Sequence, residues 1–259
     1  MKKILLVFAD YPEEKQKFFD TYMSPRNQEY AYKHGFEYLE LKENLYKYRG
    51  NYTWLKFTIL EQMIDDGYVS DGDIVTHLDA DMAIVKTDML YAPEDGKTFC
   101  YSIDSGNTHC MGSYSVRIND WSRNLVKNIL SEDRFKHYID KIYPHPVVNN
   151  YNFWGWFREQ ASWYSLAGIV PHSNEPFWNL PNYGWHSEKD EYTLYSLNEL
   201  YENVQLLPTE WNVTEMPGES YCQYNINKIN SENVIIRHFA GGQPWRKEWF
   251  LTSESKNEN

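Results

Sequence analysis

The sequence has few cysteines and lacks a long hydrophobic run, and each shortage excludes a class of protein. Its 259 residues include three cysteines, Cys100, Cys110 and Cys222. The number is odd and no two have C-x-x-C spacing, which argues against a disulfide framework and a structural zinc site. No stretch approaches the ~18 consecutive apolar residues that a membrane span needs. We therefore predict no membrane span, a reducing compartment and a cytoplasmic location.

Positive charge is also scarce. The chain carries 25 Lys and Arg against 37 Asp and Glu, a formal net charge of −12. This balance argues against non-specific binding to nucleic acid or to anionic membranes. If the ligand is an anion, the protein must supply local positive charge or a metal ion.

No interior segment is rich in Pro, Gly or Ser, as a linker would be. We therefore predict one domain over residues 1–250, followed by a polar, disordered tail over 251–259. The apolar run at 4–9 is too short for a signal peptide and lacks a cleavage site, so it is predicted to be the first strand. Aromatic residues make up 17% of the chain, which suits a large core and surfaces on which sugars could stack.

Alternating strand and helix patterns predict an α/β fold. Strand patterns at 4–9, 36–41 and 73–78 alternate with helical patterns at 13–34, interrupted at Pro25, and at 53–66. Further strands are predicted at 98–103, 113–118, 204–208 and 234–239, and further helices at 121–130 and 154–166. This order predicts a single Rossmann-like domain with a mixed, mostly parallel sheet flanked by helices. In such folds the carboxyl ends of the strands form the ligand crevice.

The stretch DIVTHLDADMAIV, residues 73–85, places two carboxylates between two β-prone runs. Burying Asp79 and Asp81 so close together is unfavourable unless something positive neutralises them. Carboxylate oxygens suit Mg²⁺ or Mn²⁺. An ordinary acidic turn at a strand end is the alternative, but the predicted position at the carboxyl end of a strand favours a metal site.

Four short motifs occur in the order found in one enzyme family. They are Trp54-Leu55-Lys56, Leu78-Asp79-Ala80-Asp81, Glu159-Gln160-Ala161 and His238-Phe239-Ala240-Gly241. With these motifs the chain resembles a GT-A glycosyltransferase of the retaining galactosyl-, mannosyl- and xylosyltransferase type (fungal mannan and plant xyloglucan enzymes), and more loosely the glycogenin-like family. The resemblance spans roughly residues 4 to 245. Each motif alone is weak, and their order and spacing are what make the match specific.

The resemblance implies that Asp79, Asp81 and His238 hold one Mn²⁺ or Mg²⁺, which bridges the diphosphate of a nucleotide sugar. A metal would stabilise the negative charge that develops on the leaving phosphate. Gly241 would let the backbone approach a phosphate closely. For His238 alone, a packed histidine at a strand end is the alternative.

The resemblance also places Glu159 and Gln160 beside the transferred sugar. A carboxylate there could stabilise an oxocarbenium-like state or act as a nucleophile. The family has Asp where this chain has Glu159, so the role of this residue stays open. A solvated helix face is the other interpretation.

Other predicted contacts surround the donor and the acceptor. A cationic Lys56 would hold phosphate, unless it only extends along an amphipathic helix. The family often has Lys after the final glycine where this chain has Gln243. Either Arg246 or Lys247 substitutes for it, or the donor is held more weakly. The remaining predicted donor residues are Ala9, Asp10, Tyr11 (stacking on the base) and Ala80, and the predicted acceptor residues are Trp185, Trp211 and Asn212.

Together these features predict a metal-dependent transferase that moves a hexose or pentose from a nucleotide diphosphate sugar, a UDP-sugar, to a hydroxyl of a glycan acceptor with retention. Two alternatives stay open: an inverting transferase of the same fold, and a sugar-binding module without catalysis. The sequence does not specify the sugar, the acceptor, the linkage or the oligomeric state.

Overall fold

The computed structural model describes residues 1–42, 54–105, 109–131, 158–169, 185, 189, 193–214 and 231–239. In this part of the chain a six-stranded sheet has the order β2-β1-β3-β6-β5-β7, and a three-stranded sheet has the order β4-β9-β8. The strands are β1 (Lys3–Phe8), β2 (Glu37–Leu41), β3 (Ile74–Asp79), β4 (Met82–Ile84), β5 (Phe99–Ile103), β6 (His109–Arg117), β7 (Val204–Leu207), β8 (Val213–Thr214) and β9 (Ile236–His238).

The large sheet is mostly parallel, as predicted. Strands β2 and β3 run parallel to β1 on either side of it, and β7 runs parallel to β5. Among the described strands of this sheet, only β6 runs antiparallel to its neighbours, β3 and β5. The carboxyl ends of β1, β3 and β5 therefore lie at one edge of the sheet.

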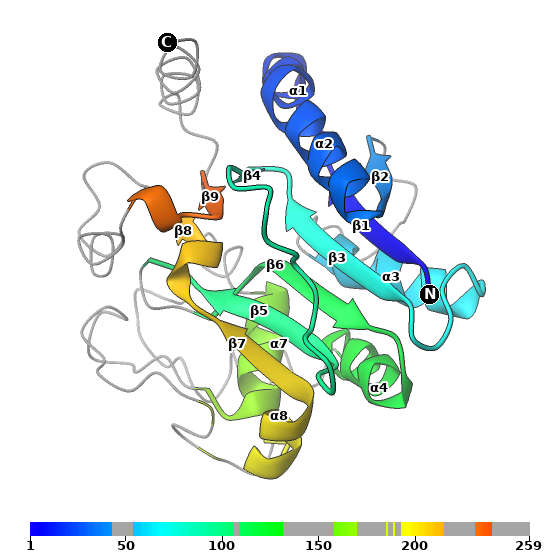
Figure 1. Cartoon of the computed structure of the whole chain (residues 1–259). Coiled ribbons are helices and arrows are strands. Elements are labelled where there is room, and N and C mark those ends of the chain that lie inside the picture. Colours follow the sequence, from blue (N-terminus) through cyan, green and yellow to red (C-terminus); the bar gives the residue numbers. More distant parts are fainter. Residues whose placement is uncertain are drawn as a thin grey trace.

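Side chains that alternate along the strands build a hydrophobic core on each face of the large sheet, and helices lie on both faces (Figure 1). Ile4 and Leu6 of β1 join a core covered by the helices α3 (Leu55–Asp65), α4 (Asp120–Ile129) and α7 (Arg158–Ala167). Leu5 and Val7 join the opposite core, which is covered by α2 (Ser24–His34) and by the small sheet. Because β1 is covered on both faces, it is a continuous apolar run.

The first helical region does not break at Pro25, so the predicted interruption there is wrong. Helix α1 (Glu13–Phe18) continues through a π-helical turn, η1 (Phe19–Met23), into α2. Pro25 lies at the start of α2, directly after the π-helical turn, so the hydrogen-bond spacing of the helix changes next to the residue that lacks a backbone N–H. Gly35 ends α2 with a left-handed φ of 68°, as its position predicted.

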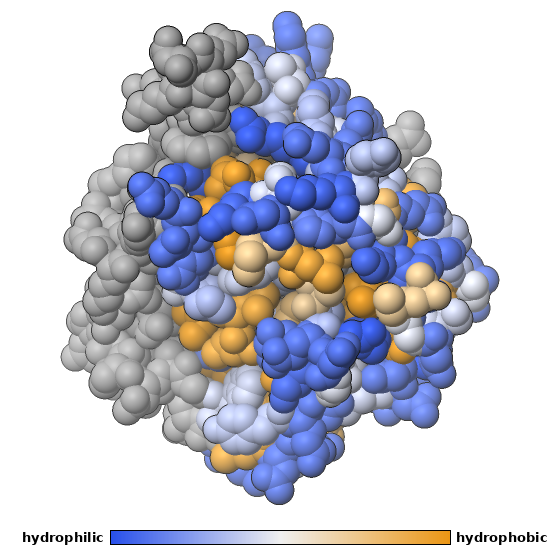
Figure 2. Space-filling model, in the orientation of Figure 1, coloured by the Kyte–Doolittle hydropathy of each residue, from blue (hydrophilic) through white to orange (hydrophobic). Residues whose placement is uncertain are grey.

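Two short elements were not predicted. Helix α8 (Leu197–Asn203) begins with a capping box in which Ser196 and Glu199 exchange side-chain and backbone hydrogen bonds. Strand β8 has two residues and pairs with β9. Among the described helices, none is long and apolar enough to cross a bilayer. The face shown in Figure 2 has apolar side chains over its middle and polar ones around them.

Candidate functional site

The candidate site lies where β1 and β3 end side by side. Phe8 of β1 pairs with Asp79 of β3, so Ala9, Asp10 and Tyr11 follow β1 next to the Asp79-Ala80-Asp81 segment. The backbone N–H of Ala9 donates to the Leu41 carbonyl at 2.8 Å, which ties the end of β2 to the same edge. The structure thus brings the predicted donor residues of the first strand close to the predicted acidic pair.

Asp79 points toward the α3 and α7 face of the sheet. Its Oδ1 lies 3.0 Å from Lys56 Nζ and 2.9 Å from His77 Nε2. Burial by itself favours the neutral carboxyl, but the Coulomb attraction of Lys56 and the hydrogen bond from His77 outweigh it and hold the pKa of Asp79 well below its ordinary value. Asp79 is therefore ionised and already has two partners.

Lys56 lies at the centre of this cluster and is only 4% exposed. Its ammonium contacts Asp79, Glu159 Oε1 at 3.1 Å and the Met111 carbonyl at 3.0 Å. Burial alone would lower its pKa, but Asp79 and Glu159 raise the pKa above its ordinary value. An ammonium has three donors, and here all three are used within the protein. Lys56 therefore does not extend into solvent, and in this arrangement it has no donor left for a phosphate.

Glu159 and Gln160 enter the same cluster from α7, and both are buried. Glu159 is therefore not on a solvated helix face. Its Oε2 is buried and has no hydrogen-bond partner among the described residues. Gln160 accepts from the Met111 N–H at 3.0 Å and donates to Tyr164 Oη at 2.8 Å. Gln160 thus fixes α7 against β6, and Glu159 keeps one free carboxylate oxygen.

One residue of this site, His77, was missed from the sequence, and Gly112, which the resemblance places along the donor sugar, also lies against Asp79. Burial lowers the pKa of His77 despite the neighbouring Asp79, so the neutral ring donates its Nε2–H to that carboxylate. A Cβ on Gly112 would lie 3.0 Å from Asp79 Oδ2 and 2.7 Å from Met82 Cε. His77 is part of a predicted strand, and nothing in a single sequence marks it as a partner of Asp79.

Asp81 and His238 meet on the other side of the strand end. Strand β9 pairs antiparallel with β4, and the Phe239 N–H donates to the Asp81 carbonyl at 2.8 Å. This pairing places His238 Nε2 3.6 Å from Asp81 Oδ1. The ring's Nδ1 lies 3.1 Å from Asn212 Oδ1. Residues from distant parts of the sequence therefore converge here, as the motif order predicted.

The fit of a metal ion can be tested on these contacts. Two ligand atoms about 2.1 Å from one ion lie about 3.0 Å apart at a right angle and about 3.4 Å apart at the tetrahedral angle. The Asp81–His238 separation of 3.6 Å is close to this range, and a carboxylate with a neutral imidazole is a suitable donor pair. Within the described residues, however, no three His, Cys, Asp or Glu side chains form a metal-binding group. The predicted triad is incomplete because the carboxylate of Asp79 is bound by Lys56 and His77.

The predicted acceptor residues are mostly enclosed. Trp211 is 7% exposed, and its ring centroid lies 5.2 Å from that of Tyr91 in the core. Asn212 is fully buried, and its Oδ1 faces His238. The indole N–H of Trp185 donates to Tyr101 Oη at 2.9 Å. Gly241, Arg246 and the segment 251–259 lie outside the described residues.

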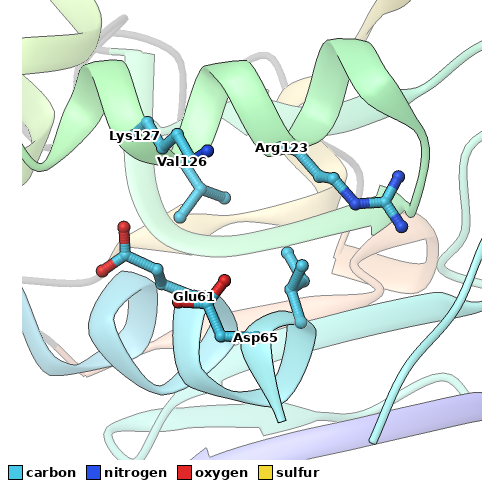
Figure 3. Close-up of a pocket in the computed structure, with 6 residues that line it drawn as sticks. Glu61, Asp65, Arg123, Val126 and Lys127 are labelled. Atoms are coloured by element: carbon cyan, nitrogen blue, oxygen red, sulfur yellow. The ribbon is translucent and has the colours of Figure 1, made fainter. Parts of the chain in front are cut away.

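A separate shallow pocket lies between α3 and α4 (Figure 3). Acidic side chains of α3 face basic side chains of α4 across it, and none of the predicted site residues lines it. The lining residues are Glu61, Ile64, Asp65, Arg123, Val126 and Lys127.

Comparison with known proteins supports the fold. No family model matches the chain, and no curated protein matches its sequence. Among solved structures, 98% of the chain aligns with all of a glycosyltransferase involved in glycosylation of the major capsid of PBCV-1, with a TM-score of 0.51 and 11% identity. Mouse xyloside xylosyltransferase 1, in its apo form, aligns over 94% of this chain and 99% of its own, with a TM-score of 0.49 and 10% identity. The first of these two alignments shows that the chain has a glycosyltransferase fold of the GT-A kind.

Proposed function

We propose that the protein is a metal-dependent glycosyltransferase that moves a hexose or pentose from a nucleotide diphosphate sugar, a UDP-sugar, to a hydroxyl of a glycan acceptor. The observation that carries this proposal is the meeting of Asp81 and His238 at 3.6 Å, beside the joined ends of β1 and β3. The GT-A fold supports it. Retention of anomeric configuration, and membership in the mannan and xyloglucan enzyme type, belong to the proposal and rest on the motifs alone.

In this proposal Asp81 and His238 are the protein's ligands for Mn²⁺ or Mg²⁺. Such an ion, when bound, neutralises charge on the donor's diphosphate. Asp79, held by Lys56 and His77, contributes negative charge at the same edge. Ala9, Asp10 and Tyr11 adjoin this edge and would contact the nucleoside.

Glu159 would act at the transferred sugar. Its Oε1 is held by Lys56, and its buried Oε2 has no partner among the described residues. A buried carboxylate oxygen without a partner is costly, and a sugar hydroxyl or the developing positive charge of an oxocarbenium-like state would satisfy it. Gln160 is bound to Met111 and Tyr164, so we assign it to the support of α7.

The proposal is tested by nucleotide release from a panel of UDP- and GDP-sugars, with and without Mn²⁺. We expect Asp81→Asn and His238→Gln each to lower metal-dependent turnover about 100-fold or more, because each removes a group that stabilises charge in the transition state. Glu202→Gln, a change in an exposed carboxylate on α8, is the control and should keep full turnover.

Binding measurements separate the transferase from its alternatives. Calorimetry with UDP should show tighter binding when Mn²⁺ is present. A sugar-binding module without catalysis would bind neither UDP nor Mn²⁺. NMR of the product's anomeric carbon distinguishes retention from inversion. Unchanged turnover in Asp81→Asn would overturn the metal assignment.

A further inference from the structure

The second ring nitrogen of His238 has a defined environment of its own. Nδ1 faces Asn212 Oδ1 at 3.1 Å and Thr214 Oγ1 at 3.3 Å, while Nε2 faces Asp81. The two nitrogens of a neutral imidazole differ, since one carries the proton and the other a lone pair. The contacts at Nδ1 therefore decide what Nε2 can do.

An amide oxygen accepts hydrogen bonds and cannot donate one. Asn212 Oδ1 lies within hydrogen-bond distance of Nδ1, at 3.1 Å, whereas Asp81 Oδ1, which is also an acceptor, lies 3.6 Å from Nε2 and beyond that distance. The proton of a neutral imidazole is therefore on Nδ1, and the Nε2 lone pair is on the side of Asp81. The Thr214 hydroxyl donates to the same amide oxygen at 3.4 Å, so it adds to this arrangement without competing for the proton.

Asn212 is rigidly held. It is fully buried, and it follows the 3₁₀ turn η4 (Thr209–Trp211), whose Thr209 carbonyl accepts the Asn212 N–H at 2.8 Å. The next strand is tied to the large sheet, because Ser105 Oγ donates to the Thr214 carbonyl at 2.5 Å. The backbone that carries the amide is thus held relative to the end of β5.

We propose that Asn212 is a positioning residue that sets the tautomer of His238, so that Nε2 presents its lone pair to a divalent cation beside Asp81. The inference rests on the metal role given to His238 under the proposed function. It replaces the acceptor contact predicted for Asn212 from the sequence. Outer partners of this kind orient the ligand ring and raise its basicity, and their loss costs about 10- to 100-fold in metal affinity.

The tautomer can be measured without metal or substrate. In ¹⁵N-histidine-labelled protein treated with a chelator, the two nitrogens of His238 give different shifts according to which is protonated, and His238→Gln assigns the signals. We expect protonated Nδ1 in the wild type and in Asn212→Asp, which keeps an acceptor oxygen. We expect Asn212→Leu to lose this preference. Thr214→Val should retain it, and this change leaves the Ser105 bond to the Thr214 carbonyl intact.

Metal affinity is the second measurement. Mn²⁺ titration by electron paramagnetic resonance should show about 10- to 100-fold weaker binding in Asn212→Leu and a smaller change in Thr214→Val. A wild-type ring protonated on Nε2, or an Asn212→Leu tautomer equal to that of the wild type, would overturn the positioning role. If the tautomer responds as expected but the wild type binds no Mn²⁺, the proposed metal-dependent function fails instead.

Discussion

At the scale of single residues, Lys56 joins two acidic side chains from different elements in one buried cluster. Its ammonium lies 3.0 Å from Asp79 and 3.1 Å from Glu159, and Glu159 is only 6% exposed. A buried ion pair contributes little net stability compared with apolar packing, but removing one partner leaves the other charge buried and uncompensated. The cluster therefore depends on Lys56 more than on either carboxylate.

We expect Lys56→Met to lower the free energy of unfolding by about 3 kcal/mol, because it strands the Glu159 carboxylate in the interior. Denaturant unfolding measures this loss. The double variant Lys56→Met/Glu159→Gln should recover part of it, since the stranded charge is then gone. The surface change Lys15→Met is the control, and a Lys56→Met loss no larger than that of Lys15→Met would contradict the prediction.

The proximity of distant residues was predictable where a motif linked them and not where packing brought them together. The motif order predicted that Asp81 and His238 would meet, and they lie 3.6 Å apart. The motif also grouped Asp79 with them, but the position of Lys56 on α3 gives Asp79 a different partner. Nothing local in the sequence indicates this, because the contact joins residues from two elements on one face of the sheet.

At the scale of elements, β6 pairs with the end of β3 so closely that a side chain at position 112 would crowd Asp79 and Met82. A Cβ there would meet Asp79 Oδ2 at 3.0 Å and Met82 Cε at 2.7 Å. Real Cβ atoms essentially never show contacts below 3.0 Å, so the flexible end of Met82 must move and the carboxylate is crowded. The close approach of the two strands thus sets the position of Asp79.

Gly112→Ala should therefore lower the free energy of unfolding by about 1 to 3 kcal/mol through overpacking and reduce donor turnover. Denaturant midpoints and nucleotide release measure the two effects. A double-mutant cycle with Met82→Ala reports how much of the loss comes from the methionine. If Met82→Ala restores the stability of Gly112→Ala but not its turnover, the turnover loss is assigned to the crowding of Asp79. Unchanged turnover in Gly112→Ala would contradict this assignment.

Elements that bury a regular apolar pattern were predictable, and those that exist only through pairing were not. The alternation at 36–41 predicted β2 (Glu37–Leu41), and the helical face beginning near Trp54 predicted α3 (Leu55–Asp65). Strand β8 has two residues, too few for any periodicity, and it is a strand because β9 lies beside it. Strand β8 also places Thr214 beside His238.

At the scale of the whole molecule, the two sheets meet at the end of β3. Strand β3 of the large sheet ends at Asp79, and β4, a strand of the small sheet, begins at Met82. The Asp-Ala-Asp segment is therefore the link between the sheets, and its two carboxylates face different partners. The order of strands and helices predicted the large sheet, but the small sheet depends on β9 returning from near the end of the described chain to pair with β4.

The buried centre of this arrangement should make the stability of the whole protein depend on pH through His77. Burial lowers the pKa of the folded ring below its ordinary value of 6.5. As pH falls through 6.5, the unfolded chain takes up a proton that the folded protein does not, so the free energy of unfolding decreases. The contribution of His77 is present above pH 6.5 and is lost below it, with a limiting slope of about 1.4 kcal/mol per pH unit for one proton.

Urea unfolding of the metal-free protein between pH 7.5 and pH 4.5 measures this dependence. His77→Gln should show a shallower slope than the wild type, because glutamine can still donate to Asp79 but does not titrate. Tyr114→Phe is the matched control: it removes the hydroxyl that bonds the Lys56 carbonyl and keeps the ring beside His77. It should lower stability without changing the slope. Equal slopes in His77→Gln and the wild type would contradict the prediction, because the buried imidazole would then take up its proton in the folded state as it does in the unfolded chain. Asp79 would in that case be paired with two cations, Lys56 and protonated His77.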